Sequence, residues 1–137
     1  MPTFAMKTYR LIVLISLVLM IPIGLASKFY RGPFDTWLNH SVGGIFYEMF
    51  WILLGVAIWP NLQPGAVAAG VFLVTSFLEF LQLWHLPGLT VIRSTLIGRL
   101  LLGTTFDWSD FLYYIIGCVI PWLALRRLRH HLQLPEN

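Results

Sequence analysis

Two glutamates and four nearby polar residues stand where they could do chemistry at a membrane. Glu48 and Glu79 both lie within apolar segments. A carboxylate at mid-depth costs about 2.5–3.5 kcal/mol on insertion scales, so each needs a partner or a proton. The other candidates are Gln82, Arg93, Arg99 and Asp110. Together these types could bind a polar or phosphate-bearing headgroup, because arginine grips phosphate and carboxylates orient the arginine.

The composition indicates that a bilayer is the solvent of this chain. Of its 137 residues, 58% are hydrophobic and 11% are charged, against roughly 45–50% and about 25% in soluble domains. The net charge of +3 comes from basic residues at the ends of apolar segments. That placement is a topology signal rather than a nucleic-acid footprint, so we expect a membrane protein that binds no nucleic acid.

Four apolar segments predict four spans in one polytopic domain, residues 1–137, at about 11–26, 44–59, 65–84 and 110–125. The first could instead be a signal peptide, since Gly24 and Ala26 are small residues at a plausible cleavage site. A retained span is favoured, because the run is long for a signal peptide and the later segments need a partner helix. Pro22 should kink this helix or end its regular part. A polar loop is expected from Ser27 to Gly43.

A shorter helix is expected between spans three and four, at about 92–102. At 1.5 Å per residue it would reach only about 16 Å, which is too short to cross the bilayer. Its apolar residues leave no wide polar face. The expected fold is therefore an all-α membrane protein, a four-transmembrane-helix bundle with a short interfacial or re-entrant helix.

The positive charges predict the topology. Four spans place both termini on one side, which then carries five basic residues, Lys7, Arg10, Arg126, Arg127 and Arg129. The other side carries four, Lys28, Arg31, Arg93 and Arg99. The positive-inside rule favours cytoplasmic termini, and the basic tail after span four should attract anionic lipid.

Helical spacing places polar and small residues on one face of three spans. The faces are Gly44, Glu48, Trp51 and Gly55; Ser76, Glu79 and Gln82; and Asp110, Tyr114, Gly117 and Pro121. Such faces turn inward in a bundle, since lipid offers polar groups no partner. Both glutamates then lie in the leaflet away from the termini. We expect Glu79 to pair with Arg93, or else with Arg99.

Structural explanations compete with a binding site. Asp107 and Asp110 have the spacing of an N-cap and its N3 carboxylate, so they could simply start the fourth helix. A Glu–Arg pair could lock the short helix onto the bundle. Cys118, the only cysteine, is expected to be a buried packing residue. The histidines lack the spacing of a metal site, and we expect neither a metal nor another cofactor.

Several motifs resemble an uncharacterised bacterial membrane family, the domain of unknown function 2809. They are GLASK at 24–28, LEFLQ at 78–82, Arg93, GRLLLG at 98–103 and FDWSD at 106–110. The resemblance covers nearly the whole chain and implies a small multi-pass protein of the bacterial cytoplasmic (inner) membrane. Some members carry a YjgA-type ribosome-maturation label, but nothing in this chain could form a soluble ribosome-binding domain.

A more distant similarity is to VanZ-like proteins, small membrane proteins associated with glycopeptide resistance. Their pattern of Glu-x-x-Gln, Arg, Asp and Gly is matched in order by Glu79, Gln82, Arg93, Asp110 and Gly117. The spacing differs, since the interval between Arg93 and Asp110 is short in VanZ-like proteins. Residues 94–109 would then be an insertion.

These residues favour a small membrane protein that binds a lipid or lipid-linked headgroup in an accessory role. One alternative is an interaction or assembly subunit of a larger membrane complex, in which the polar cluster is structural. Another is an enzyme acting on a lipid-linked substrate with Glu79 as acid or base, although no nucleophile or metal is evident. The expected partner is membrane lipid, with other membrane proteins or further copies of the chain as alternatives.

Overall fold

The computed structural model describes residues 4–81, 91–92, 94–97 and 108–134. The described chain is helical, without strands. Its elements are α1 (Phe4–Phe29), α2 (Asp35–Trp37), the π-helical turn η1 (Leu38–Val42), α3 (Gly43–Ile58), α4 (Pro64–Leu81) and α7 (Ser109–His131). The predicted all-α bundle is confirmed. Residues 91–92 and 96–97 are helical, but the rest of the short helix expected at 92–102 lies largely outside the described residues.

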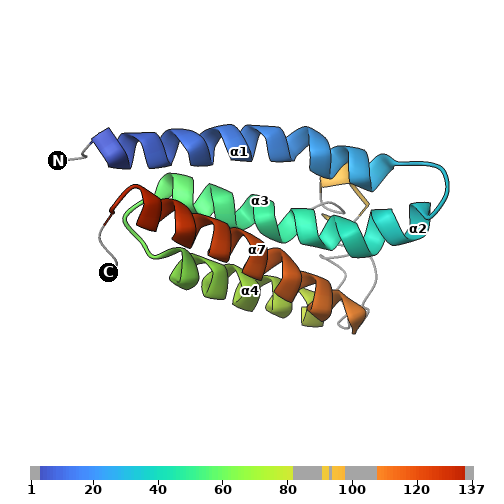
Figure 1. Ribbon diagram of the computed structural model, residues 1–137. Coiled ribbons are helices and arrows are strands. Elements are labelled where there is room, and N and C mark those ends of the chain that lie inside the picture. Colours follow the sequence, from blue (N-terminus) through green and yellow to red (C-terminus); the bar gives the residue numbers. More distant parts are fainter. Residues whose placement is uncertain (1–3, 82–90, 93, 98–107, 135–137) are drawn as a thin grey trace.

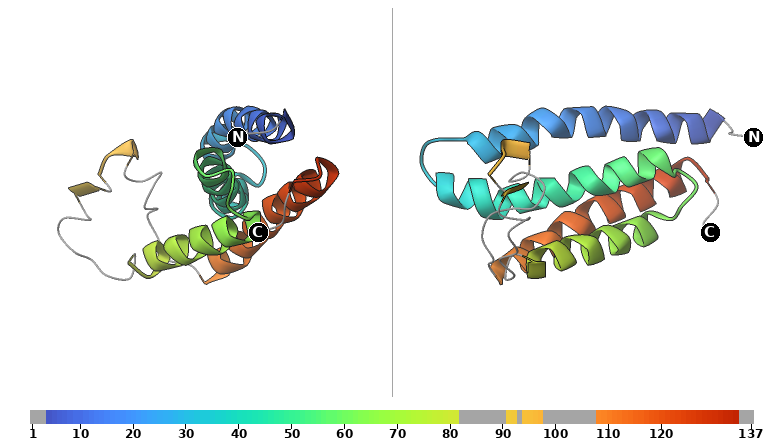
Figure 2. Two further views of the ribbon diagram at one scale, coloured as in Figure 1. Left: turned by 90° about the vertical axis from the view of Figure 1, so that its left-hand side faces the viewer. Right: turned by 180° about the vertical axis from the view of Figure 1, so that it is seen from behind.

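The four long helices form a bundle with α3 at its centre. Helix α3 packs against α1, α4 and α7, and α4 packs against α7. Seen end-on, α1 lies on one side of α3 while α4 and α7 lie on the other (Figure 2). Both termini and the α3–α4 turn lie at one end of the bundle, which we call the termini end (Figure 1). We call the other end, where α1 ends and α3 and α7 begin, the loop end.

The lengths of the helices indicate a membrane protein. Helices α1, α4 and α7 are long and apolar enough to cross a membrane. Helix α3 has only 16 residues, but α2 and η1 continue it without a break from residue 35 to 58. At 1.5 Å per residue this stretch reaches roughly 35 Å, which exceeds the hydrocarbon thickness of a bilayer. The outer surfaces expose large apolar side chains such as Val18, Leu73 and Phe77, as lipid-facing positions do.

Helix α1 is longer than the predicted first span. It continues through Pro22 to Phe29, so the proline does not end it. The loop predicted from Ser27 to Gly43 is correspondingly shorter, because helix resumes at Asp35.

Side chains explain why this region is helical. A π-helical turn departs from regular α-helical pairing of the backbone, and the Ser27 hydroxyl donates a hydrogen bond to the carbonyl oxygen of Leu38, 2.9 Å away. The Asn39 amide donates to the carbonyl oxygens of Tyr30, at 3.0 Å, and Asp35. These bonds connect the end of α1 to the start of the α2–η1–α3 stretch.

Helix α7 differs from the prediction at both ends. Its N-cap is Trp108, without a side-chain cap; Asp107, the candidate cap, lies outside the described residues. At the other end the helix runs through the predicted basic tail to His131. Arg129 is only 3% exposed and donates a hydrogen bond to the carbonyl oxygen of Pro60 at 2.9 Å. Its guanidinium carbon lies 5.2 Å from the ring centroid of the buried Tyr9.

Arg129 is therefore an internal group, contrary to the expectation that the tail serves topology and lipid attraction. One side chain of α7 holds the α3–α4 turn and the start of α1.

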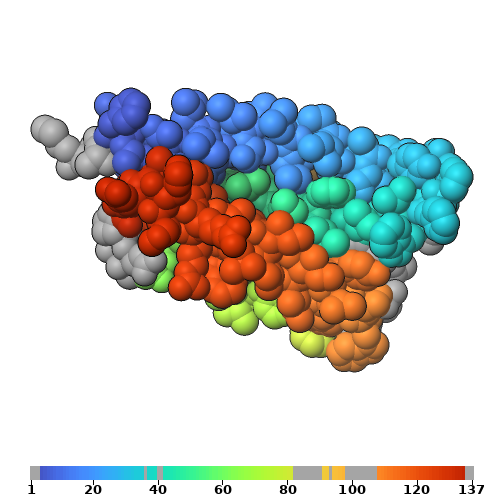
Figure 3. All heavy atoms as spheres, in the orientation of Figure 1, coloured from blue at the N-terminus to red at the C-terminus, as the bar shows by residue number. Residues whose placement is uncertain are grey.

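The core lies between α3 and its neighbours. Helix α1 contributes Tyr9, Val13 and Leu17; α3 contributes Ile52, Leu53, Val56 and Ala57; α4 contributes Ala68; α7 contributes Cys118 and Leu125. Figure 3 shows α7 lying across one face of the molecule with α1 along its edge. Helices α3 and α7 approach each other closely at Gly117, where an added Cβ atom would lie 2.8 Å from both Glu48 Cβ and the Ile45 carbonyl oxygen.

We predict that Gly117→Ala lowers the free energy of unfolding by about 1–3 kcal/mol, the usual cost of overpacking. The added methyl group would meet backbone and Cβ atoms that cannot move alone. Gly70→Ala is the matched control, since a Cβ atom there meets nothing within 4 Å. Thermal unfolding in mild detergent measures both. Equal stability of the two variants would contradict the close approach.

Candidate functional site

The polar residues predicted for a site come from three helices that meet at the loop end. Glu48 lies in the second turn of α3, Glu79 in the last turn of α4 and Asp110 in the first turn of α7. All three are therefore in the half of the bundle away from the termini. Gln82, Arg93 and Arg99 lie outside the described residues, so the expected contact of Glu79 with Arg93 or Arg99 stays a prediction.

Glu79 is buried in the bundle, with 1% of its surface exposed. The Tyr114 hydroxyl of α7 donates a hydrogen bond to Glu79 Oε2 over 2.9 Å. Gly44 of α3 makes room for this tyrosine, because a Cβ atom there would lie 3.3 Å from its ring. Tyr114 thus reaches Glu79 past the small residue on α3.

Glu48 is fully buried, with 0% exposed. The Cys118 thiol donates to Glu48 Oε2 at 3.1 Å, and the hydroxyl of Thr75, 4% exposed, is next to the same carboxyl group. Thr75 itself donates to the carbonyl oxygens of Val71 and Phe72, one turn earlier on α4. Cys118 is buried, as predicted, but it does more than pack.

These groups lie at two successive levels of the bundle, Glu79 with Tyr114 and Glu48 with Thr75 and Cys118. We call the five residues together the polar layer. Tyr114 and Cys118 are four residues apart on α7, so one face of this helix meets Glu79 and Glu48 in succession. The same spacing relates Thr75 to Glu79 on α4. Sequence reasoning placed Tyr114 on the inward face but missed Thr75 and Cys118, which i, i+4 spacing from Glu79 and Tyr114 could have identified.

Three buried polar atoms in this part of the bundle have no hydrogen-bond partner among the described residues. They are Glu48 Oε1, the Trp51 indole nitrogen and the Ser76 hydroxyl oxygen. All three residues belong to the faces predicted to turn inward. An unsatisfied buried polar group costs about 1–3 kcal/mol, so each of these atoms would gain from a further hydrogen-bond partner.

Aromatic side chains surround the loop end of α4 and α7. Phe80, Trp108 and Phe111 contact one another with ring centroids 5.5 to 6.3 Å apart. The indole nitrogen of Trp37 donates to the Tyr113 hydroxyl at 3.1 Å. Trp37 and Trp108 are exposed, as tryptophans at a membrane interface are. Along α7, Tyr114 and Cys118 lie six and ten residues after Trp108, so the polar layer runs from near this interface toward the middle of the bundle.

The described residues contain no group of three or more His, Cys, Asp or Glu side chains that could hold a metal ion. The chemistry on offer is hydrogen bonding and charge: two carboxyl groups, a phenol, a thiol and a hydroxyl in a low-dielectric interior.

A family model described as "Protein of unknown function (DUF2809)" matches residues 34–118, which is more than half of the chain. The matched segment contains the whole polar layer. No solved structure matches the chain. The resemblance to VanZ-like proteins stays a prediction.

We predict that Tyr114→Phe lowers the free energy of unfolding by about 1 kcal/mol, because it removes the hydroxyl that donates to a buried carboxyl group. Tyr113→Phe is the matched control, since its hydroxyl only accepts a bond from the exposed Trp37. Chemical or thermal unfolding in detergent compares the two. A loss of equal size in both variants would show that the bond to Glu79 carries no special weight.

Proposed function

The chain belongs to the DUF2809 family of proteins of unknown function, and we propose that it binds the headgroup of a membrane lipid or lipid-linked molecule. The proposed site is the loop end of the bundle, and the proposed role is accessory. The observation that carries the proposal is the convergence of Glu48 and Glu79, 0% and 1% exposed, at one end of the bundle. Ionisable groups within a membrane bundle are expensive, and they mark functional sites more often than packing.

The unpartnered atoms support binding rather than packing. A polar layer that served only to hold helices together would be expected to satisfy its own hydrogen bonds. Instead, Glu48 Oε1, the Trp51 indole nitrogen and the Ser76 hydroxyl retain unused capacity within the described part of the chain. Glu48 Oε1 can accept a hydrogen bond, the Trp51 indole nitrogen can donate one, and the Ser76 hydroxyl can do both. A ligand with hydroxyl or amine groups suits this combination.

The remaining residues of the proposed site follow Glu79 along the chain. Gln82 lies three residues later, and Arg93 and Arg99 belong to the segment between α4 and α7. In the proposal, the arginines bind the phosphate of the headgroup, and Glu79 and Asp110 orient them. The exposed tryptophans at the loop end, Trp37 and Trp108, support a site at headgroup depth.

We further propose that the protein lies in the bacterial cytoplasmic membrane with both termini in the cytoplasm. The termini end exposes four basic side chains, Lys7, Arg10, Arg126 and Arg127. Arg129 does not count toward this charge, because it is buried against Tyr9 and Pro60. The sequence then places four basic residues on each side, and the proposed orientation rests on the four exposed ones at the termini end against Lys28 and Arg31 among the described residues of the loop end. A cluster of exposed arginine and lysine beside helix ends is typical of the cytoplasmic side.

Reporter fusions test this orientation. A reporter that is active only in the cytoplasm should be active when fused after Asn137 or inserted at Asn61 in the α3–α4 turn. The same reporter inserted at Gly32, in the α1–α2 connection, should be inactive. The opposite pattern would overturn the proposed orientation, and activity at all three positions would contradict a membrane-spanning bundle.

Isosteric substitutions test the headgroup site. We predict that Glu79→Gln and Glu48→Gln each reduce the lipid that co-purifies in mild detergent by about tenfold, as loss of one charge-assisted contact implies. Asp35→Asn removes a carboxylate at the same end but outside the polar layer, and it should retain the lipid. Native mass spectrometry measures the bound lipid, and thermal unfolding confirms that each variant folds.

Other outcomes identify the alternatives. Unchanged lipid in folded Glu79→Gln protein would contradict headgroup binding. Stoichiometric membrane-protein partners in its place would favour an assembly subunit. A lipid-linked molecule that is chemically altered by the wild-type protein, and not by Glu79→Gln, would favour an enzyme.

A further inference from the structure

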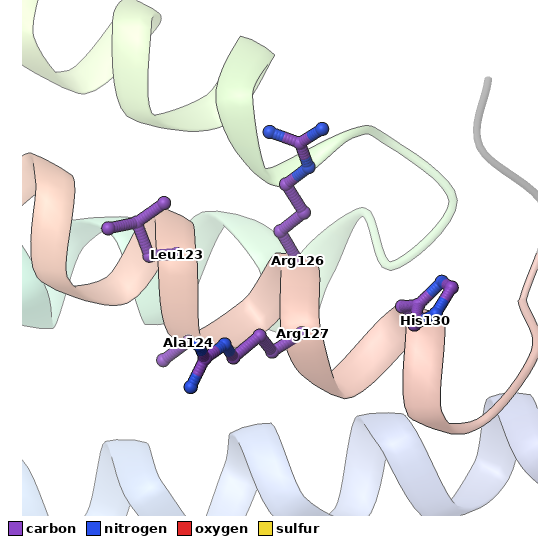
Figure 4. Close-up of a pocket in the computed structure, with 5 residues that line it drawn as sticks. All are labelled: Leu123, Ala124, Arg126, Arg127 and His130. Carbon is purple, nitrogen blue, oxygen red and sulfur yellow. The ribbon is translucent and has the colours of Figure 1, made fainter.

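A pocket lies on the opposite part of the molecule, along α7 at the termini end. It has a volume of about 740 Å³. Its lining residues are Leu123, Ala124, Arg126, Arg127 and His130 (Figure 4). Leu123 and Ala124 lie toward the middle of the bundle, and the three basic side chains follow within two turns toward the end of the helix. The pocket therefore passes from an apolar part to a basic part along the axis of α7.

Within the described ranges of the chain, the charge around this pocket has one sign. The carboxylate side chains that the structure describes, Asp35, Glu48, Glu79 and Asp110, all belong to the loop end. Lys7 and Arg10 of α1 are exposed at the same end as the pocket. Among the described residues, nothing at the termini end neutralises Arg126 and Arg127.

The tryptophans indicate where the pocket lies in the membrane. Trp122 is one turn before Arg126. The guanidinium carbon of Arg126 lies 6.0 Å from the centroid of the Trp122 ring. The end of α3 exposes Trp59 at the same end of the bundle. Tryptophans at a helix end mark the boundary between hydrocarbon and headgroups. Leu123 and Ala124 directly follow Trp122 and thus lie at this boundary, where acyl chains meet their headgroups, and the basic side chains lie beyond it at phosphate depth.

We propose that this pocket binds an anionic phospholipid of the leaflet at the termini end. The phosphate lies among Arg126, Arg127 and His130, and an acyl chain runs along Leu123 and Ala124. The two arginines leave α7 in different directions in Figure 4. Both are exposed, and their long stems allow both guanidinium groups to turn toward one phosphate.

An anionic lipid fits better than other occupants. A soluble anion would use the basic part and leave the apolar part empty, while a zwitterionic lipid would gain less from uncompensated positive charge. Basic pockets on transmembrane helices are suited to anionic headgroups. Arg129 is not part of the site, because it already donates to Pro60. The site is separate from the one at the loop end, and neither depends on the other.

Lipid titration of the full-length protein in detergent, followed by native mass spectrometry, tests the proposal. The wild-type protein should bind phosphatidylglycerol in preference to phosphatidylcholine. The double variant R126Q/R127Q should lose about tenfold in phosphatidylglycerol affinity or more, because two charged contacts near the membrane surface are removed. K7Q/R10Q removes the same charge from the same end but outside the pocket, and it should bind nearly as the wild type does.

Ala124→Trp tests the shape of the pocket separately from its charge. This change fills the apolar part and leaves every charge in place, so it should also weaken phosphatidylglycerol binding. Both Ala124 and the two arginines are exposed, and unfolding curves confirm that the variants fold. Equal losses in R126Q/R127Q and K7Q/R10Q would overturn the site in favour of diffuse attraction. Unchanged binding in Ala124→Trp, or competition by inorganic phosphate as strong as by the lipid, would overturn the acyl-chain part.

Discussion

The close approach of α3 and α7 at Gly117 is the constraint on which the polar layer depends. Any side chain at this position would collide with Glu48 Cβ and the Ile45 carbonyl oxygen. The contact brings Tyr114 and Cys118, which lie on either side of Gly117 along α7, within reach of Glu79 and Glu48. A wider separation would take both donors away from the two carboxyl groups.

The bundle is held by buried polar contacts at both ends and by apolar packing between them. At the loop end the polar layer joins α3, α4 and α7. At the termini end Arg129 joins α7 to the α3–α4 turn and lies over Tyr9 of α1. Because lipid is as apolar as the core, hydrophobic burial alone gives membrane helices little reason to associate in one register. Hydrogen bonds at two levels specify how far each helix is shifted along its neighbours.

Apolar length and helical spacing were enough to predict the long helices and the inward faces containing Glu48, Glu79 and Tyr114. They could not predict contacts between distant segments. Cys118 was interpreted as a packing residue, because nothing near it in sequence shows that Glu48 comes to its thiol. Arg129 was expected to belong to a basic tail that sets topology and attracts anionic lipid for the same reason, since Tyr9 and Pro60 are remote in sequence. In the first loop, Ser27 and Asn39 donate hydrogen bonds to backbone carbonyl oxygens and connect α1 to the helical stretch that follows. The composition of the loop does not predict these bonds.

The unequal charge of the two ends limits what the proposed loop-end site can bind. A bare phosphate would be attracted to the termini end, where the described side chains are basic. At the loop end it would meet Glu48, Glu79 and Asp110, which disfavour an anion unless Arg93 and Arg99 outweigh them. Under the proposed function, a headgroup at the loop end would offer the carboxyl groups an amine or several hydroxyls in addition to phosphate. The two proposed sites would then differ in ligand chemistry, with an amino- or sugar-bearing headgroup at the loop end and an anionic phospholipid at the termini end.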